Sequence, residues 1–307
     1  MKKLAPVAFF TYNRLDHTRR SFQALKNNQL ADKTELFVFS DAAKTDQQLK
    51  EIEQVRSYLS DQTEGFKNIE IIRRRNNFGL ADSIISGVSR VLKDYEHIIV
   101  IEDDISTSPF FLDFMNQMLS AYHNQKQVFS VSGYNHPAKL MPIPADYPYD
   151  VYFCPRCSSW GWGTWKDRWN QTDWTVADFQ NFKNSRGKQS AFNQGGQDLT
   201  QQLIKQQKGK LDSWAIRWCY TLFVNQALCL YPVKSYTNNI GFDGTGVHCG
   251  KERKYQNLSL NQKTYLKLPQ KIEVNETIMK QFRNVYRPKP LTRFLRMAQK
   301  IAGIFRD

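Results

Sequence analysis

Apolar and polar positions alternate in blocks along the first 135 residues. Continuous apolar, β-branched or aromatic runs predict five buried strands, over Leu4–Thr11, Glu35–Ser40, Ile69–Ile72, His97–Ile101 and Val128–Ser132. Helical spacing of apolar positions separates them at 15–25 and 84–92, and Pro109 marks the expected start of a helix over 110–123. Strands that are apolar throughout and alternate with helices favour an α/β fold with a mostly parallel sheet flanked by helices.

The second half of the chain has a different character. Four prolines between residues 137 and 148 interrupt regular structure, and all seven tryptophans lie between Trp160 and Trp218. We expect residues 136–286 to be loop-rich and to pack against residues 1–135 within one domain. Residues 287–307 return to a helical pattern, with apolar side chains on one face and basic ones opposite. Such a C-terminal amphipathic helix is typical of an anchor on an anionic membrane surface, although packing on the domain explains the same pattern.

The net charge of +14 is concentrated near the C-terminus. Residues 251–307 contain 14 basic and 4 acidic residues, which is +10 of the total. This basic segment is separate from the tryptophans, which argues against a nucleic-acid-binding protein. No run approaches the roughly 20 apolar residues that span a bilayer, and the apolar start lacks a signal-peptide cleavage pattern. We therefore expect a cytoplasmic protein, peripheral on the inner face of the cell membrane.

The five cysteines are an odd number in a chain of this length, which fits a reducing compartment. Cys154 and Cys157 have the spacing of a zinc knuckle, but no second pair follows in the sequence. Free thiols are the simpler interpretation, and a structural zinc is the alternative.

Polar side chains follow each of the first four predicted strands. They are Tyr12, Asn13 and Arg14, then Asp41, then Arg73–Arg75 with Asn76–Gly79, and last Glu102, Asp103 and Asp104. Ligands bind beyond the carboxyl ends of the strands in open α/β sheets, so we expect these groups to converge. A hard cation on one or two carboxylates can neutralise a sugar-diphosphate leaving group. Acidic turns after strands are common, but their convergence with arginines favours a nucleotide and a metal-bound diphosphate.

Several of these motifs resemble the GT-A glycosyltransferases. The matching positions are Tyr12-Asn13-Arg14, Asp41, Arg75, Asn77, Gly79, Glu102-Asp103-Asp104, Pro109, Phe111, Trp160-Gly161-Trp162 and Asp212-Ser213-Trp214. Their order is most similar to the animal N-acetylglucosaminyltransferase that initiates complex N-glycans and to bacterial enzymes of surface-polysaccharide synthesis, such as lipopolysaccharide and capsule. The Tyr12-Asn13 pair departs from the animal enzyme, which leaves the nucleotide open.

The resemblance implies a GT-A fold and roles for particular residues. Arg14 and Asp41 contact the nucleoside, Asp103 bonds the ribose or donor sugar, and Asp104 ligates Mn²⁺ or Mg²⁺ beside Glu102. The remaining donor-site residues are Tyr12, Asn13, Arg75, Asn77 and Gly79. An inverting reaction is implied, with UDP-linked GlcNAc, Gal or Glc as the default donor and a glycan or lipid-linked glycan as acceptor.

An inverting transfer needs a carboxylate base for the acceptor hydroxyl, and Asp212 is the best candidate. Asp212 also fits an N-cap of the following helix, and Asp198 and Asp243 are reserves. Most tryptophans are expected in the core, with Trp160 and Trp214 lining the sugar cleft.

The glycine-rich segment 241–248 suits a lid over the diphosphate. His248 in this segment is a candidate metal or phosphate ligand, and a surface histidine is the simpler interpretation.

Two other classes of protein share some of these features. A sugar-1-phosphate nucleotidyltransferase also places acids at strand ends, but it needs a glycine-rich loop after the first strand, and Thr11–Arg14 contains no glycine. A non-catalytic glycan-binding protein would not need the acidic triplet or Asp212.

Overall fold

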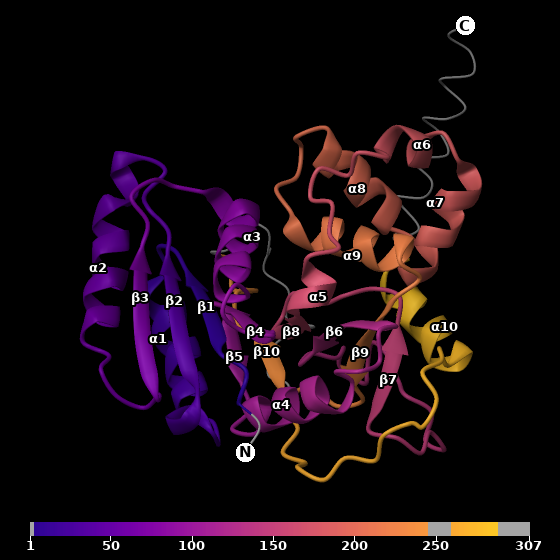
Figure 1. Cartoon of the computed structure of the whole chain (residues 1–307), viewed down its shortest axis with the longest axis horizontal. Coiled ribbons are helices and arrows are strands. Elements are labelled where there is room, and N and C mark those ends of the chain that lie inside the picture. The colour runs from indigo at the N-terminus through magenta and orange to yellow at the C-terminus, as the bar shows by residue number, and fades with distance from the viewer. Residues whose placement is uncertain (1–2, 245–258, 288–307) are drawn as a thin grey trace, which may run out of the picture.

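The apolar runs form the central strands of one sheet in the computed structural model, which describes residues 3–244 and 259–287. Eight strands follow the order β3-β2-β1-β4-β8-β6-β9-β7 across the molecule (Figure 1). Their bounds are β1 Val7–Thr11, β2 Glu35–Ser40, β3 Asn68–Arg73, β4 His97–Glu102, β6 Val128–Ser132, β7 Val151–Cys154, β8 Trp162–Trp165 and β9 Leu228–Pro232. A separate two-stranded sheet pairs β5, Ile105–Thr107, with β10, Thr237–Asn239.

Strands β1 to β4 are parallel, as the sequence predicts. Thr11 pairs with Ser40, Ser40 with Arg73, and Phe10 with Glu102, so all four strands end at the same edge. Strand β8 is antiparallel to β4 and β6, β6 is parallel to β9, and β7 is antiparallel to β9. The fold is therefore a mixed, mostly parallel α/β sheet.

Helices lie on both faces of this sheet. The bounds are α1 Leu15–Lys26, α2 Leu49–Ser60, α3 Gly79–Val91, α4 Phe111–Ala121, α5 Lys166–Trp169, α6 Phe179–Lys183, α7 Arg186–Phe192, α8 Leu199–Gln207, α9 Trp214–Val224 and α10 Glu276–Val285. Short 3₁₀ helices are η1 Ala31–Lys33, η2 Asp46–Gln48 and η3 Asn193–Gly195. The second half is thus richer in helix than its prolines indicate, with α6 to α9 grouped together (Figure 1).

The C-terminal part of the described chain contains a helix that the sequence analysis did not predict. Helix α10 begins after Asn275, whose side chain accepts a hydrogen bond from the Ile278 N–H at 3.0 Å. Its buried face includes Phe282, whose ring centroid is 5.6 Å from that of Tyr231 in β9. The predicted basic amphipathic helix over 291–305 lies outside the described residues. Among the described helices, none has both the length and the apolarity to span a membrane.

The central strands are buried on both faces, which explains their continuous apolar sequence. Ala8 and Phe10 of β1 belong to a core cluster shared with α3, α9 and α10. Val7 and Phe9 belong to a second cluster with α1, α2 and α4. Alternate side chains of one strand therefore hold two different helical layers.

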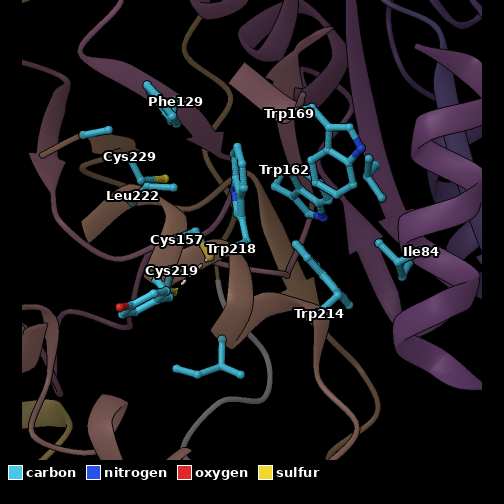
Figure 2. Close-up of a cluster of buried hydrophobic side chains, with 14 of the residues drawn as sticks. Ile84, Phe129, Cys157, Trp162, Trp169, Trp214, Trp218, Cys219, Leu222 and Cys229 are labelled. Carbon is cyan, nitrogen blue, oxygen red and sulfur yellow. Dashed lines mark hydrogen bonds between the residues drawn. The ribbon is translucent and has the colours of Figure 1, made fainter. Parts of the chain in front are cut away.

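Tryptophan rings stack where β8, α5 and α9 meet (Figure 2). The ring of Trp162 lies 4.5 Å from Trp214 and 5.7 Å from Trp169, and Trp169 lies 5.3 Å from Trp218. The Trp169 indole donates a hydrogen bond to Ser89 of α3 at 2.9 Å. The stack therefore connects the start of α9 to β8 and α3, and most tryptophans are core residues as expected.

The four cysteines of the described residues are buried free thiols. Cys157 Sγ lies 3.1 Å from Cys219 Sγ of α9 (Figure 2). Within residues 3–244 and 259–287, no three His, Cys, Asp or Glu side chains are grouped to hold a metal.

Candidate active site

An acidic turn follows β4 at the edge where the parallel strands end. Arg14 Nη2, from the end of β1, lies 2.5 Å from Asp103 Oδ1 and 3.0 Å from Asp104 Oδ2. The backbone N–H of Tyr12 donates to Asp103 Oδ2 at 3.2 Å. The Asp103 and Asp104 side chains are only 7% and 13% exposed, so little water screens these charges. The structure thus brings the first and fourth predicted polar groups together.

Glu102 is the last residue of β4 and precedes this turn. Burial, followed by the negative charges of Asp104 and Asp103, raises the pKa of Glu102 to about 8. Its carboxyl is therefore mostly protonated at neutral pH. A cation bound at the acidic turn would lower this pKa again, because its positive charge favours the carboxylate.

The small sheet closes over the acidic turn from the second half of the chain. Strand β5 pairs with β10, and the Ile240 N–H that follows β10 donates to the Asp104 carbonyl at 2.8 Å. A Cβ on the next residue, Gly241, would lie 2.5 Å from Asp104 Oδ2. Glycine allows this close approach without displacing the Asp104 carboxylate, so Gly241 is part of the site. The sequence analysis noted this glycine as the start of a loop, but it did not indicate its neighbour.

Asp41 lies at the end of β2 and is tied to the loop after β3. Both of its carboxylate oxygens accept from the Phe78 N–H at 3.1 Å, and Asn77 Nδ2 donates to Oδ2 at 3.3 Å. Burial raises the pKa of Asp41, whereas the N–H groups of Phe78 and Ala42 favour the charged form. The predicted donor-site residues of the second and third strand ends therefore lie together.

The side chains of Tyr12 and Asn13 reach α2 and the preceding 3₁₀ helix η2. The Tyr12 hydroxyl donates to Gln48 Oε1 at 2.6 Å, and Asn13 Nδ2 donates to Glu51 Oε2 at 2.6 Å. The side chain of Asn13 thus points towards α2, and the contact that Tyr12 makes with the acidic turn comes from its backbone.

Arg56 of α2 fixes the ends of β2 and β3, and the sequence analysis did not identify it. Its Nη2 donates to the carbonyl oxygens of Asp41 at 3.3 Å and Arg74 at 2.9 Å. Arg74 is buried with its guanidinium 4.2 Å from the centroid of the Phe78 ring, while the predicted ligand Arg75 is exposed. In the sequence, Arg56 has the spacing of an exposed charged position on a helix. No sequence signal distinguishes it from other exposed basic residues.

Asp212 is an exposed carboxylate next to the loop that holds Asp41. Its Oδ2 accepts from the Ala81 N–H at 3.3 Å, in the first turn of α3. A Cβ on Gly79, where φ is +72°, would lie 3.1 Å from the same oxygen. The N-cap of α9 is Ser213, which accepts from the Ile216 N–H at 3.3 Å, so the alternative role of Asp212 as that cap is wrong.

The two reserve carboxylates have other partners. Asp198 forms two hydrogen bonds with Arg156, at 2.7 and 3.0 Å, which places it in a structural ion pair. Asp243 Oδ2 lies 3.1 Å from Nε2 of His17, a buried residue of α1. The first described residues of the predicted lid, 241–244, thus lie on the acidic turn and α1.

The two tryptophans predicted to contact sugar differ in their burial. Trp214 is 2% exposed and stacked on Trp162, so its ring lies in the core. Trp160 is half-buried, with Phe242 at 5.4 Å and Tyr134 at 4.3 Å between ring centroids, and its sugar contact stays a prediction. His248 lies outside the described residues.

The acidic turn fits a divalent cation that is shared with a ligand. Mg²⁺ and Mn²⁺ sites that carry nucleotides use one or two carboxylates, with phosphates and water completing the shell. Asp104 would supply one carboxylate, and Asp103 a second whose oxygens already accept from Arg14 and Tyr12. A site of this kind does not require three protein ligands.

Parallel strands that end in an acidic turn, with a second half joined through an antiparallel strand, define a GT-A fold. Residues 7–140 match the model of Glycosyl transferase family 2. This stretch is under half of the chain and contains β1 to β4, Arg14, Asp41 and the acidic turn, and its similarity to that family supports a nucleotide-sugar glycosyltransferase. This match does not test the resemblance to the animal N-acetylglucosaminyltransferase.

Several solved structures resemble the chain at low sequence identity. No curated protein matches the chain significantly. Among solved structures, TarS 1-349 of S. aureus has 10% identity and a TM-score of 0.39, covering 76% of this chain and 59% of its own. The mannosyltransferase PcManGT from Pyrobaculum calidifontis, in complex with GDP-Man and Mn²⁺, has 11% identity and a TM-score of 0.39, covering 73% and 74%. A putative glucose-1-phosphate thymidylyltransferase from Bacillus anthracis has 11% identity and a TM-score of 0.40, covering 79% and 91%.

Proposed function

We propose that the protein is a metal-dependent inverting glycosyltransferase of surface-polysaccharide synthesis. It transfers a sugar from a UDP-linked donor (GlcNAc, Gal or Glc) to a hydroxyl of a glycan or lipid-linked glycan. The observation that carries this proposal is the convergence at one sheet edge of the Arg14–Asp103–Asp104 cluster and the Asp41 loop, with Asp212 beside that loop.

The residues divide into a donor side and an acceptor side. Asp104 would hold the cation, which supplies positive charge to the departing diphosphate when bound. Asp41 offers a buried carboxylate at the end of β2 for the nucleoside. Asp212 is exposed beside the Asp41 loop, and its carboxylate would accept the proton of the acceptor hydroxyl as the new bond forms. An α-linked donor would then give a β-linked product.

Calorimetric titration tests the donor site directly. UDP, GDP, CDP and dTDP are titrated into the wild type and Asp104→Ala, each with and without Mn²⁺. We expect one nucleotide to bind in a Mn²⁺-dependent way, and Asp104→Ala to weaken it at least tenfold, about 1.4 kcal/mol. Asp146→Ala, which removes an exposed carboxylate from another loop, serves as the control. If none of the four nucleotides binds, the proposal fails and glycan binding without catalysis becomes the better hypothesis.

A lipid-linked acceptor would place the protein at a membrane. The support is the basic amphipathic pattern of residues 287–307, most of which lie outside the described residues. Full-length protein and a 1–286 truncation are compared for sedimentation with anionic liposomes. Equal partitioning of the two proteins would contradict the anchoring role.

A further inference from the structure

Arg14 occupies the space between the two carboxylates that suit a cation. One of its nitrogens, Nη2, contacts both Asp103 Oδ1 at 2.5 Å and Asp104 Oδ2 at 3.0 Å. Its side chain is only 21% exposed. Hydrogen bonds between charged groups are strong, and in a poorly solvated site they are weakly screened. The acidic turn therefore carries an internal positive charge.

The surrounding backbone restricts the positions that the Arg14 guanidinium can reach. Arg14 is the N-cap of α1, and its carbonyl accepts from the Thr18 N–H at 2.9 Å, so the start of the side chain is held by the helix. Asp104 Oδ2 lies between Arg14 Nη2 and Gly241, where an added Cβ would come within 2.5 Å. A cation on Asp104 must either take this oxygen from Arg14 or bind close to the guanidinium.

We propose that Arg14 makes cation binding conditional on the donor. The guanidinium competes with a free divalent cation for the Asp103–Asp104 pair and keeps the affinity of the pair for that cation low. The diphosphate of the donor offsets the combined positive charge and gives Arg14 a phosphate partner. This inference rests on the proposed function, and within it Arg14 is a positioning residue.

Thermodynamic linkage makes the coupling between cation and nucleotide reciprocal. If the nucleotide raises the affinity for the cation by some factor, the cation raises the affinity for the nucleotide by the same factor. The cation and the nucleotide then bind as one unit. Removal of the Arg14 charge strengthens binding of the cation alone and reduces this coupling factor.

Electron paramagnetic resonance of free Mn²⁺ measures these affinities without any turnover. We expect the wild type to bind Mn²⁺ at least tenfold more tightly with the nucleoside diphosphate selected by the titration than without it. In the absence of nucleotide, Arg14→Gln is expected to bind Mn²⁺ at least tenfold more tightly than the wild type. Arg14→Lys keeps the charge and should stay within threefold of the wild type.

Arg20→Gln is the matched control. Arg20 lies on α1, with its side chain 55% exposed and paired with Asp16, so this variant removes the same charge away from the turn. Equal Mn²⁺ affinities of wild type and Arg14→Gln, or a wild-type affinity that nucleotide does not change, would overturn the inference. Where Arg14→Gln does not fold, Arg14→Met, which also removes the charge and keeps a long side chain, takes its place. Nucleotide binding that needs no metal in any protein would overturn the metal-dependent function itself.

Discussion

The surroundings of Asp212 distinguish it from the other carboxylates of the second half. It accepts from the Ala81 N–H at the start of α3, where the helix dipole favours a negative charge, whereas Asp198 pairs with Arg156. We expect Asp212→Asn to fold and bind donor but to lose transfer by about 10³-fold, because it has no base for the acceptor hydroxyl. Initial rates and donor calorimetry measure the two effects. Asp198→Asn should lower the melting temperature and retain turnover per folded molecule; wild-type rates from Asp212→Asn would refute the assignment.

Glu102 gives the stability of the protein a dependence on pH. Its pKa is about 8 in the folded protein, against about 4.3 in an unfolded chain. Between these values the folded protein binds more protons at this site than the unfolded chain does, so the free energy of unfolding falls as pH rises. Without divalent cations, we expect the melting temperature to fall through this window and Glu102→Gln to flatten the fall. Glu64→Gln, on an exposed loop, should keep the wild-type slope, and an unchanged slope in Glu102→Gln would contradict the pKa assignment.

At the scale of elements, the β5–β10 pair decides how closely the second half covers the acidic turn. It places Gly241 so near Asp104 that Gly241→Ala would push a methyl group against the carboxylate. We expect this variant to fold and to weaken Mn²⁺-dependent nucleotide binding at least tenfold, about 1.4 kcal/mol, in the same titration. Gly187→Ala in α7 is the control, because its added Cβ meets nothing closer than Ser185 at 3.9 Å. Equal affinities of the two variants would argue against a tight cover.

At the scale of the molecule, the sheet joins the two halves of the chain. Strand β8 pairs with β4 on one side and β6 on the other, so removing it would split the sheet. We expect a single cooperative unfolding transition. Tryptophan fluorescence reports only on residues 160–218, and far-UV circular dichroism reports on all elements, so their thermal transitions should coincide. Two resolved transitions would instead show that the halves unfold separately.

The sequence by itself determined the parallel half of the fold and the convergence of polar side chains at its edge. Buried runs and polar ends are local patterns, so β2 and β6 have the predicted bounds and the polar groups of β1 and β4 meet as expected. The sequence analysis missed helix α10 because its apolar side chains form a buried face only against the sheet on which they pack.

Only the tertiary structure decided which distant residues complete the site. Asp212 and Ala81 are 131 positions apart, and Gly241 reaches Asp104 through the pairing of β10 with β5. The packing of α9 on β8 buries Trp214 in the core, and the pairing of β1 with β4 places Arg14 between two carboxylates. These contacts depend on strand order and on chain crossings between elements, and no periodicity within a short stretch of sequence specifies them.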